Sequence, residues 1–339
     1  MAIKGEVYSP KQYELYIGIE QSAFGTAEDT ASDFVKLDVA TVGDIDWSGG
    51  LTADRTLRTG QQVKKPADHY STQQGGTWTL PFEWVVSHEE GLQQLLQLVT
   101  EDTSPNVSVV RLGSASPLEY GEHGQAANSA TATVIISNPY TSEDRVLTSA
   151  VVQDLTLSMD AGTAGGRLVA SGTFWTGYTP TIGSNTVSPA GTQTSFVKGL
   201  YHCTTKNFGA ASSELDLVAR SFSYTISFPA TRLGYQGSAG DPETYSRSGE
   251  YSASGTMQVK YDANSLPALT ALHVKGDGTA SGKERSINFG DGSAINFDLL
   301  QVIVTGYTKN MDEEAGVFVD ISFDSVALAG EAIHTLIFT

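Results

Sequence analysis

The sequence has little cysteine, no long apolar run and few basic residues. Its one cysteine, Cys203, excludes an intrachain disulfide and a zinc site built from several thiolates, so we expect either folding in a reducing compartment or a fold that needs no disulfides. No apolar run approaches the roughly 20 residues that a helix needs to span a bilayer. Residues 1–6 lack the apolar segment of a signal peptide. We therefore expect no signal peptide and no membrane insertion.

The shortage of basic residues gives the chain a strong negative charge. Twenty Lys and Arg residues face 38 Asp and Glu residues, and the formal net charge is −18 at pH 7. A surface of that average charge repels nucleic acid, which argues against a protein that reads bases or grips phosphates. The charge fits a soluble acidic protein and, more specifically, a surface to which polyanions must not adhere.

Groupings of residues that carry out chemistry are also missing. No HExxH, GxSxG or P-loop motif occurs. Asp277 lies between two glycines but lacks the alternating carboxylates of a calcium loop. Asp44 and Asp46 are two positions apart on one expected strand face, where water solvates them. We expect no enzyme, no cofactor and no metal site. The histidines are scattered singly, at His69, His88, His123, His202, His273 and His334.

Strand patterns dominate what is present. Residues Phe222–Phe228 alternate large apolar side chains with small hydroxyls, which predicts a strand with one face in a core and one in water. A return strand, Gly255–Tyr261, has the same alternation after a polar, glycine-rich stretch. A short helical pattern, Leu266–Val274, follows it.

The same order of elements occurs earlier in the chain. Ile45 and Trp47 alternate with polar residues, a long polar loop follows, and Trp78 to Trp84 then alternate in the same way. Trp47 and Trp78 are 31 positions apart, as are Ile226 and Met257. A helical pattern, His88–Val99, comes next, with Leu92, Leu95, Leu96 and Val99 on one face.

Hairpin patterns follow both helical segments. The first joins Val151–Asp160 to Gly166–Trp175, and the second joins Val302–Asn310 to Val317–Phe323. Four matching elements in one order favour an internal duplication. The spacing then places an insertion of about 29 residues between positions 100 and 149.

The predicted organisation is two tandem units in a mainly β chain. The first unit covers residues 1–180 with the insertion around 101–148, a linker covers 181–194, and the second unit covers 195–339. Other expected elements are a strand at Tyr13–Ile19, a hairpin joining Thr131–Ile136 to Val146–Val152, a hairpin turn at Gly290–Gly292 and a final strand at Ala332–Thr339 that its own sheet or a partner covers.

Two long loops hold many of the basic residues. A loop of this length without internal structure is uncommon unless it is functional, although a mobile surface loop is the alternative. We expect a projecting arm that docks on an acidic neighbouring subunit. The first loop, Gly49–Gln74, carries Arg55, Arg58, Lys64 and Lys65, and the second, Pro229–Gly249, carries Arg232 and Arg247.

Two short motifs and the order of elements resemble one family. The segment Tyr16–Ala27 reads YIGIEQSAFGTA, and Thr59-Gly60 is followed by Gly75–Glu83, which reads GGTWTLPFE. Both segments, and the order strand, long loop, strand, helix and hairpin, resemble the tail tube (major tail) proteins of long-tailed bacteriophages. The order of elements covers most of the chain, whereas the motifs are short.

The resemblance implies a structural protein of the virion tail. It implies two tandem copies of a tail-tube-like β-sandwich/barrel unit, each with one short helix and a long projecting loop. Family members form stacked rings with a β-barrel wall, usually six single-domain subunits each, and DNA passes through the lumen without specific binding. Three duplicated chains would supply six such units. The implied partners are further copies of the chain, the tape measure protein, the tail terminator and distal tail or baseplate proteins, with assembly in the host cytoplasm.

An acidic wall suits a DNA conduit because a basic wall would bind the passing phosphates. We expect the lumen to be lined in part by Asp44, Asp46, Asp320 and Asp324. The rival interpretations are a capsid decoration or tail-tip protein, a secreted sugar-binding β-sandwich and a β-sandwich glycosidase. The sugar-binding rival requires clustered exposed aromatics and a signal peptide, whereas Trp47, Trp78 and Trp84 fall on apolar strand faces.

Overall fold

The computed structural model describes most of the chain. The described residues are 13–21, 24–39, 42–45, 51–53, 69–71, 76–100, 107–110, 130–138, 143–183, 193–210, 213–234, 241–247, 251–272, 284–312, 316–326 and 332–338.

The protein is mainly β, as the sequence predicts, with two short helices. One large antiparallel sheet contains sixteen of the described strands, and two further pairs of short strands stand apart from it. The helices are α1 (Glu89–Thr100) and α2 (Leu266–Leu272), and 3-10 turns lie at Ala31–Asp33, Ala164–Gly166 and Leu200–His202. The strands are β1 (Glu14–Ile19), β2 (Phe34–Leu37), β3 (Leu51–Ala53), β4 (His69–Ser71), β5 (Trp78–Val85), β6 (Val107–Val110), β7 (Ala132–Ser137), β8 (Asp144–Asp160), β9 (Val169–Thr176), β10 (Thr181–Gly183), β11 (Thr205–Ala210), β12 (Ser213–Asp216), β13 (Ala219–Ser227), β14 (Thr231–Leu233), β15 (Thr244–Ser246), β16 (Ser252–Lys260), β17 (Arg285–Gly290), β18 (Ile295–Asp312), β19 (Gly316–Ser325) and β20 (Ala332–Phe338).

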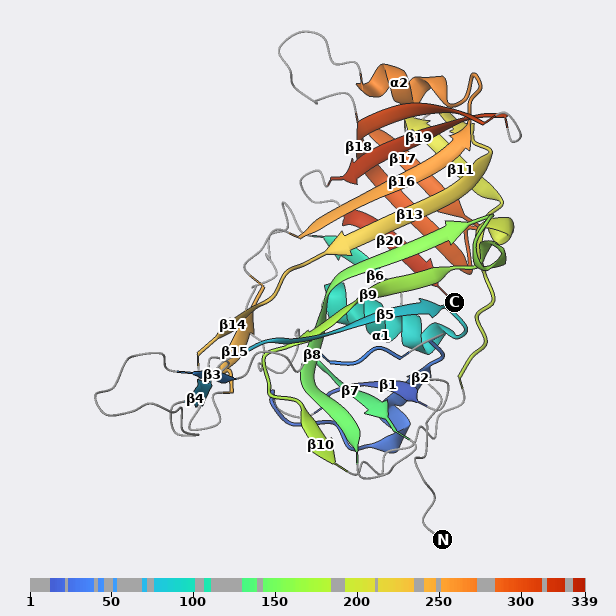
Figure 1. Cartoon of the computed structure of the whole chain (residues 1–339). Helices are drawn as coiled ribbons and strands as arrows, with labels where there is room; N and C mark the ends of the chain where they lie inside the picture. The colour runs from blue at the N-terminus through green and yellow to red at the C-terminus, as the bar shows by residue number, and fades with distance from the viewer. Residues whose placement is uncertain are drawn as a thin grey trace.

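Seven strands form one continuous layer across the molecule. Their order is β5, β9, β8, β13, β16, β19 and β18, and each pairs antiparallel with the next. Figure 1 shows these strands stacked from β5 upward to β18. The period-two patterns produce this layer, because successive side chains of a strand point to opposite faces. In β5, for example, Trp78, Leu80, Phe82 and Trp84 are buried and the residues between them are exposed.

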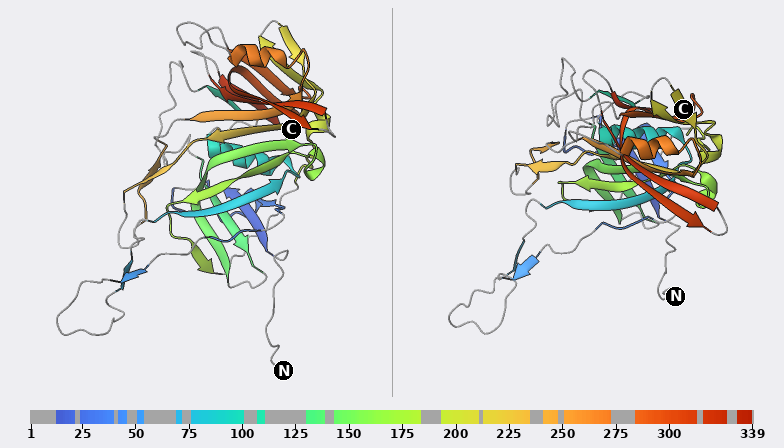
Figure 2. Two further views of the ribbon diagram at one scale, coloured as in Figure 1. Left: turned by 45° about the horizontal axis from the view of Figure 1, so that its top comes forward. Right: turned by 90° about the horizontal axis from the view of Figure 1, so that it is seen from above.

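The two longest strands, β8 and β18, link this layer to further strands. The first part of β8 pairs with β7 and β10, and the first part of β18 pairs with β17 and β20. Beyond β7 lie β1 and β2, and beyond β17 lie β11 and β12. The strands β2, β1, β7 and β8 of the first half therefore pair in the same order as β12, β11, β17 and β18 of the second half. Figure 2 shows the two sets at opposite ends of the molecule.

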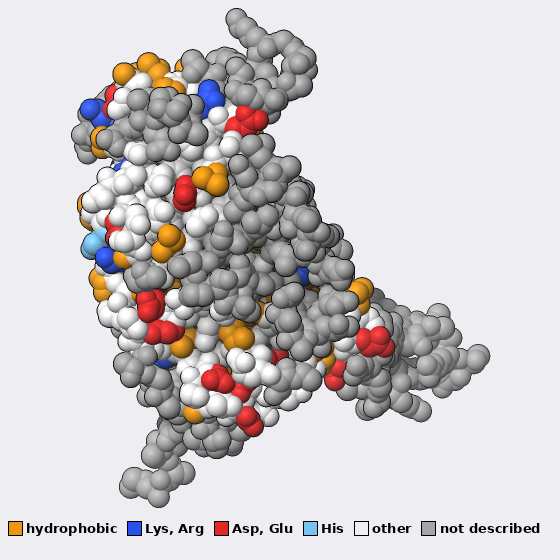
Figure 3. All heavy atoms as spheres, turned by 180° about the vertical axis from the view of Figure 1, so that it is seen from behind, with side chains coloured by type: hydrophobic (Ala, Val, Ile, Leu, Met, Phe, Trp, Pro, Cys, Tyr) orange, Lys and Arg blue, Asp and Glu red, His pale blue; other side chains and the backbone are white. Residues whose placement is uncertain are grey.

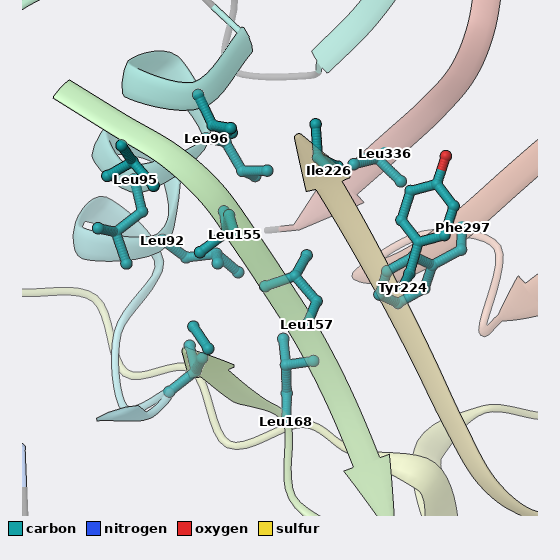
Figure 4. Packing of buried hydrophobic residues seen from close by; sticks show 14 of the residues in the cluster. Leu92, Leu95, Leu96, Leu155, Leu157, Leu168, Tyr224, Ile226, Phe297 and Leu336 are labelled. Carbon is teal, nitrogen blue, oxygen red and sulfur yellow. The ribbon is translucent and has the colours of Figure 1, made fainter. Parts of the chain in front are cut away.

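Both halves contribute to one hydrophobic core. Helix α1 buries Leu92, Leu95 and Leu96 against the apolar face of β8, as its one-sided pattern predicts. On the neighbouring strand β13, Tyr224 and Ile226 lie beside Phe297 of β18 and Leu336 of β20 (Figure 4). The same cluster thus runs from the first half of the chain into the second.

The sequence predicts two tandem units, and the described strands of the two halves share one sheet and one core. The expected barrel is not closed by the described strands of the single chain, which form one large sheet. The physical reason is the pairing of β8 with β13, because it joins the two halves edge to edge over seven residue pairs. Within the expected linker, 181–194, Thr181–Gly183 form β10, and just beyond it Ser195 bridges to His88.

The predicted hairpins are confirmed, whereas nine of the described strands were not predicted: β2, β3, β4, β6, β10, β11, β12, β14 and β15. β7 pairs with β8, β8 with β9, β17 with β18, and β18 with β19. The apolar C-terminal strand β20 is covered on both edges, by β18 and by β6. Strand β6 lies within the expected insertion, and its four residues, VSVV, are too short for a period-two pattern to be recognised.

Two small hairpins project from the body. β3 pairs with β4, and β14 pairs with β15. Both lie on the left side of Figure 1, and Figure 2 shows β3–β4 standing further out than β14–β15. These hairpins belong to the two long loops that the sequence predicts to be arms.

Candidate functional site

The candidate site is the polar face of the seven-strand layer. Cross-strand neighbours share a face, so the pairing registers show which side chains stand in one row. Four of the strands contribute serine or threonine to a central row, and rows with carboxylates lie on either side of it. The central row is Ser158, Ser223, Thr256 and Ser322.

The two flanking rows mix hydroxyls with carboxylates. Their members come from strands far apart in the sequence, which only the sheet brings together. One row is Asp160, Ser221, Gln258, Asp320 and Thr308. The other is Glu83, Ser171, Thr156, Thr225, Ser254 and Asp324.

Hydrogen bonds hold some of these side chains flat along the sheet. The hydroxyl oxygens of Thr156 and Thr225 are 2.8 Å apart. Asp320 accepts a hydrogen bond of 2.8 Å from the Gln258 side-chain amide and another from the Asn310 amide. Short, hydrogen-bonded side chains of this kind give a polar surface that carries few long Lys or Arg side chains.

The charge of this face is mainly negative. Glu83, Asp154, Asp160 and Asp324 are exposed, and Asp320 is half-buried. Lys260 and Arg220 lie at one end of the layer, where the Arg220 guanidinium stacks 5.5 Å from the centre of the Phe318 ring. A polyanion that approaches the middle of the face therefore meets carboxylates and neutral hydroxyls.

The structure brings together two of the four expected lumen residues. Asp320 and Asp324 lie on one face of β19 with Ser322 between them, as the alternation predicts. Asp44 is exposed and forms an ion pair with Arg145. It lies beside β5, since Gly43 packs next to the Pro81 carbonyl, and β19 is therefore several strands away. Asp46 lies outside the described residues.

Of the six expected contact residues in the arms, two are described, and both bond within the chain. The Arg232 guanidinium donates hydrogen bonds of 2.8 Å to the Gly76 carbonyl and 2.7 Å to the Gly177 carbonyl. Arg247 is fully buried and donates to the carbonyls of Leu98, Val152 and Phe228. Its expected role in a subunit contact does not follow from this position, because these contacts are internal. The residues that lie outside the described segments are Arg55, Arg58, Lys64 and Lys65.

The second arm docks on the first half of the chain through an aromatic cluster. The Tyr245 ring lies 4.7 Å from that of Trp175 and 4.8 Å from that of Phe24. The Tyr245 hydroxyl accepts a 2.7 Å hydrogen bond from the Gly177 amide, and burial raises the pKa of this phenol. This cluster fixes the base of the β14–β15 hairpin against β9.

Several residues of the polar face were not singled out from the sequence. Asp154 and Asp160 bracket Thr156 and Ser158 on β8, and Glu83 ends the exposed series on β5. The signal that could have identified them is the alternation Asp-Leu-Thr-Leu-Ser-Met-Asp at residues 154–160. It shows one polar face on that strand, but not which strands lie beside it.

Other functional features are limited within the described part of the chain. No group of three or more His, Cys, Asp or Glu residues there could hold a metal ion. Cys203 is buried, and no helix among those residues is long and apolar enough to cross a membrane. Comparison with models of known protein families gives no match, and comparison with curated proteins finds no similar sequence.

Proposed function

We propose that this chain is the tail tube protein of a long-tailed bacteriophage, a structural component of the virion and not an enzyme. Three copies form a ring of six similar units, and stacked rings form a tube through which DNA passes to the host. The observation that carries the proposal is the polar face of the seven-strand layer, with rows of small hydroxyls and carboxylates shared by both halves of the chain.

The strand pairings support two tandem tail-tube-like units. In chain order, β1, β2, β5, α1, β7, β8, β9 and β10 correspond to β11, β12, β16, α2, β17, β18, β19 and β20. Each pairing in the first series has its counterpart in the second, such as β9 with β5 and β19 with β16. Chance would not repeat six antiparallel pairings in one order, whereas duplication of a single unit does so directly.

The charge of the polar face supports its role as the lumen wall. Passing DNA releases few counterions at the middle of this face, where it meets carboxylates and neutral hydroxyls, so it is not held. Hydroxyls and carboxylates keep water and cations between the wall and the phosphates. The net charge of −18 is in keeping with such a wall.

Assembly and partners follow from the proposed role. Copies of the chain associate into rings and stacked tubes, and the tape measure protein, the tail terminator and distal tail or baseplate proteins meet the tube at its lumen and ends. The protein is assembled in the host cytoplasm and requires no cofactor, and DNA passes through the tube without specific binding. The β3–β4 arm reaches a neighbouring subunit or ring.

Electron microscopy of negatively stained protein at rising concentration tests the proposal. Hollow tubes or stacked rings are expected, and rotational averages should show three chains per ring. The proposal is overturned if the protein stays dispersed both alone and after addition of an initiator complex from phage tails.

The arms are tested by charge reversal. Replacing Arg55, Arg58, Lys64 and Lys65 by Glu should leave folded, soluble protein that no longer forms tubes. The control replaces Arg220 and Lys260, which are exposed and lie outside both arms, by Glu. Unchanged tube formation by the arm variant would remove the docking role.

The wall is tested by reversing its charge in the assembled tube. Tubes of the variant Asp154→Lys/Asp324→Lys should retain DNA fragments at low salt and release them as the salt concentration rises. The same two residues changed to Asn should retain no DNA. Equal retention by tubes of the Lys variant, the Asn variant and the wild type would place these residues away from the lumen.

A further inference from the structure

Among the described residues, the pairing of β8 with β13 is the longer of the two strand junctions between the halves of the chain. Strand β8 pairs with β13 from Asp154↔Ser227 to Asp160↔Ser221. On its apolar side, Leu157 and Met159 are buried opposite Tyr224 and Phe222. The junction therefore combines a backbone ladder with a shared core and a continuous polar face.

Strand β18 carries the equivalent edge at the far end of the layer. Val152 pairs with Phe174 just before a bulge in β8, and Val304 pairs with Phe323 just before a bulge in β18. Aligning the two bulges places Met311 at the position of Met159. Met159 is 1% exposed, whereas Met311 is 76% exposed. The same side chain at the same position is thus covered in one half and bare in the other.

The backbone of β18 is also open along this edge. Its pairings with β17 end at Val302 and those with β20 at Asp298, so residues 303–312 pair with β19 alone among the described parts of the chain. A long edge of this kind is a template for another strand. Tyr261 and Leu266 are exposed as well: the centre of the Tyr261 ring lies 4.1 Å from the Lys309 ammonium of β18, and Leu266 begins α2, which packs on β18. Figure 3 shows hydrophobic side chains at the end of the molecule that carries α2.

A complementary segment lies at the opposite end of the layer. Residues 42–45 run beside β5, with Gly43 next to the Pro81 carbonyl and Ile45 buried. They precede the first arm as β13 precedes the second, and they lie next to β5 without forming a strand, whereas β13 pairs with β16 in a ladder. Asp44 is exposed and Ile45 is buried, so these two neighbouring side chains point to opposite sides, as neighbours in β13 do.

We infer that the open edge of β18, Gly306–Asp312, binds the segment around residues 42–45 of a second copy of this chain, in the geometry of the β8–β13 junction. The contact covers Met311 and Leu266 and extends the polar face from one chain to the next. It uses two different surfaces, so repetition gives a closed ring or an open filament. The proposed function requires that these contacts close into a ring. The pairing of β18 with the next copy does not require closure, because an open filament uses the same contact.

Engineered cysteines test the pairing, because the native Cys203 is buried. By analogy with Ser158↔Ser223, a cysteine replacing Asn310 should face one replacing Asp44 or Val42 of the next copy, within the roughly 4.4–6.8 Å between Cα atoms that a disulfide requires. Asn310→Cys/Asp44→Cys or Asn310→Cys/Val42→Cys should form chains linked between molecules under oxidation. Ser158→Cys/Ser223→Cys is the positive control and should link only within one molecule.

A second variant measures the apolar part of the contact. Met311→Asp should weaken self-association in sedimentation velocity by about 100-fold or more, because the junction would bury an unpaired charge. Ile182→Asp is the matched control, since Ile182 is also an exposed apolar residue, at 61%, and should leave association unchanged.

The outcomes separate this inference from the proposed function. Intermolecular links without tubes support the pairing and count against the tail tube. The pairing is overturned, and the proposed tail tube is not, if tubes form and the Ser158/Ser223 control forms its disulfide but neither cysteine pair with Asn310 forms one. Unchanged association of Met311→Asp also overturns it.

Discussion

Arg247 shows how one side chain can join elements that are distant in the sequence. Its guanidinium bonds the Leu98 carbonyl at the end of α1, the Val152 carbonyl of β8 and the Phe228 carbonyl after β13, and it lies 5.0 Å from the centre of the Phe228 ring. These three carbonyls meet where the two halves of the chain join. A planar group with five donors in fixed directions suits them, and a lysine cannot replace it.

Arg247→Met should therefore destabilise the protein by about 2–4 kcal/mol, because buried carbonyls lose their donors. Arg247→Lys should also destabilise it, since one ammonium group cannot reach three separated carbonyls. Chemical denaturation measures both effects. Arg220→Met, which removes an exposed guanidinium, should cost less than about 0.5 kcal/mol. A similar loss for both positions would contradict the bridging role.

Glu20 is a second residue whose surroundings come from several elements. Its carboxylate accepts hydrogen bonds from the hydroxyls of Thr131, Thr133 and Ser149 and from the Ser149 amide, at 2.6 to 2.9 Å. Burial raises the pKa of this carboxyl, and these hydrogen bonds lower it, with a net increase above 4.5. The neutral form therefore stabilises the fold below pH 4.5, and this contribution is lost as the pH rises through the folded-state pKa.

Glu20→Gln mimics the neutral form, so its free energy of unfolding relative to wild type should depend on pH. The difference should be constant below pH 4.5 and should move in favour of the variant as the pH rises above it. Urea denaturation at a series of pH values measures it, with the exposed Glu83→Gln as the control. A difference that moves in favour of the wild type would refute the raised pKa.

At the scale of elements, the bulge in β8 depends on a glycine in its partner strand. The register between β8 and β9 shifts between Val152 and Leu155, and Gly172 lies opposite Leu155. A Cβ atom at Gly172 would lie only 2.5 Å from the Asp154 carbonyl oxygen. The strand can bend here only because the facing residue has no side chain.

Gly172→Ala should cost about 2 kcal/mol or more, because the clash is with backbone and not with a flexible side chain. Gly183→Ala in β10 is the matched control, since a Cβ there meets nothing within 4 Å. Thermal denaturation of both variants compares them. An equal melting temperature would show that β8 relaxes without loss.

At the scale of the whole molecule, the shared sheet and core bind the two halves into one cooperative body. The β8–β13 pairing, the bridging Arg247 and the pairing of β6 with β20 all cross between the halves. If the halves were independent domains, separating them would expose little apolar surface. In this protein, separating the halves would expose buried side chains such as Leu157 and Tyr224.

Thermal unfolding at a concentration where the protein is monomeric should therefore show one transition in calorimetry, with equal calorimetric and van't Hoff enthalpies. Residues 1–180 and 195–339 produced separately should each unfold at a lower temperature than the full chain. Two resolved transitions in the intact chain would show that the halves are independent domains.

The period-two patterns by themselves determined that the chain is mainly β, where most strands run and which of their faces is apolar. They also determined one helix per half and the hairpins, because these depend on residues close together in the sequence. Asp320 and Asp324 could be placed on one polar face for the same reason.

Only the tertiary structure decided which strands are neighbours. The pairing of β8 with β13, the place of β6 beside β20 and the burial of Arg247 depend on contacts between residues far apart in the chain. Alternation fixes the face of a strand but not its partner, because every amphipathic strand offers the same hydrogen-bonding edges. The rows of hydroxyls and carboxylates that support the proposed function exist only once those edges have met.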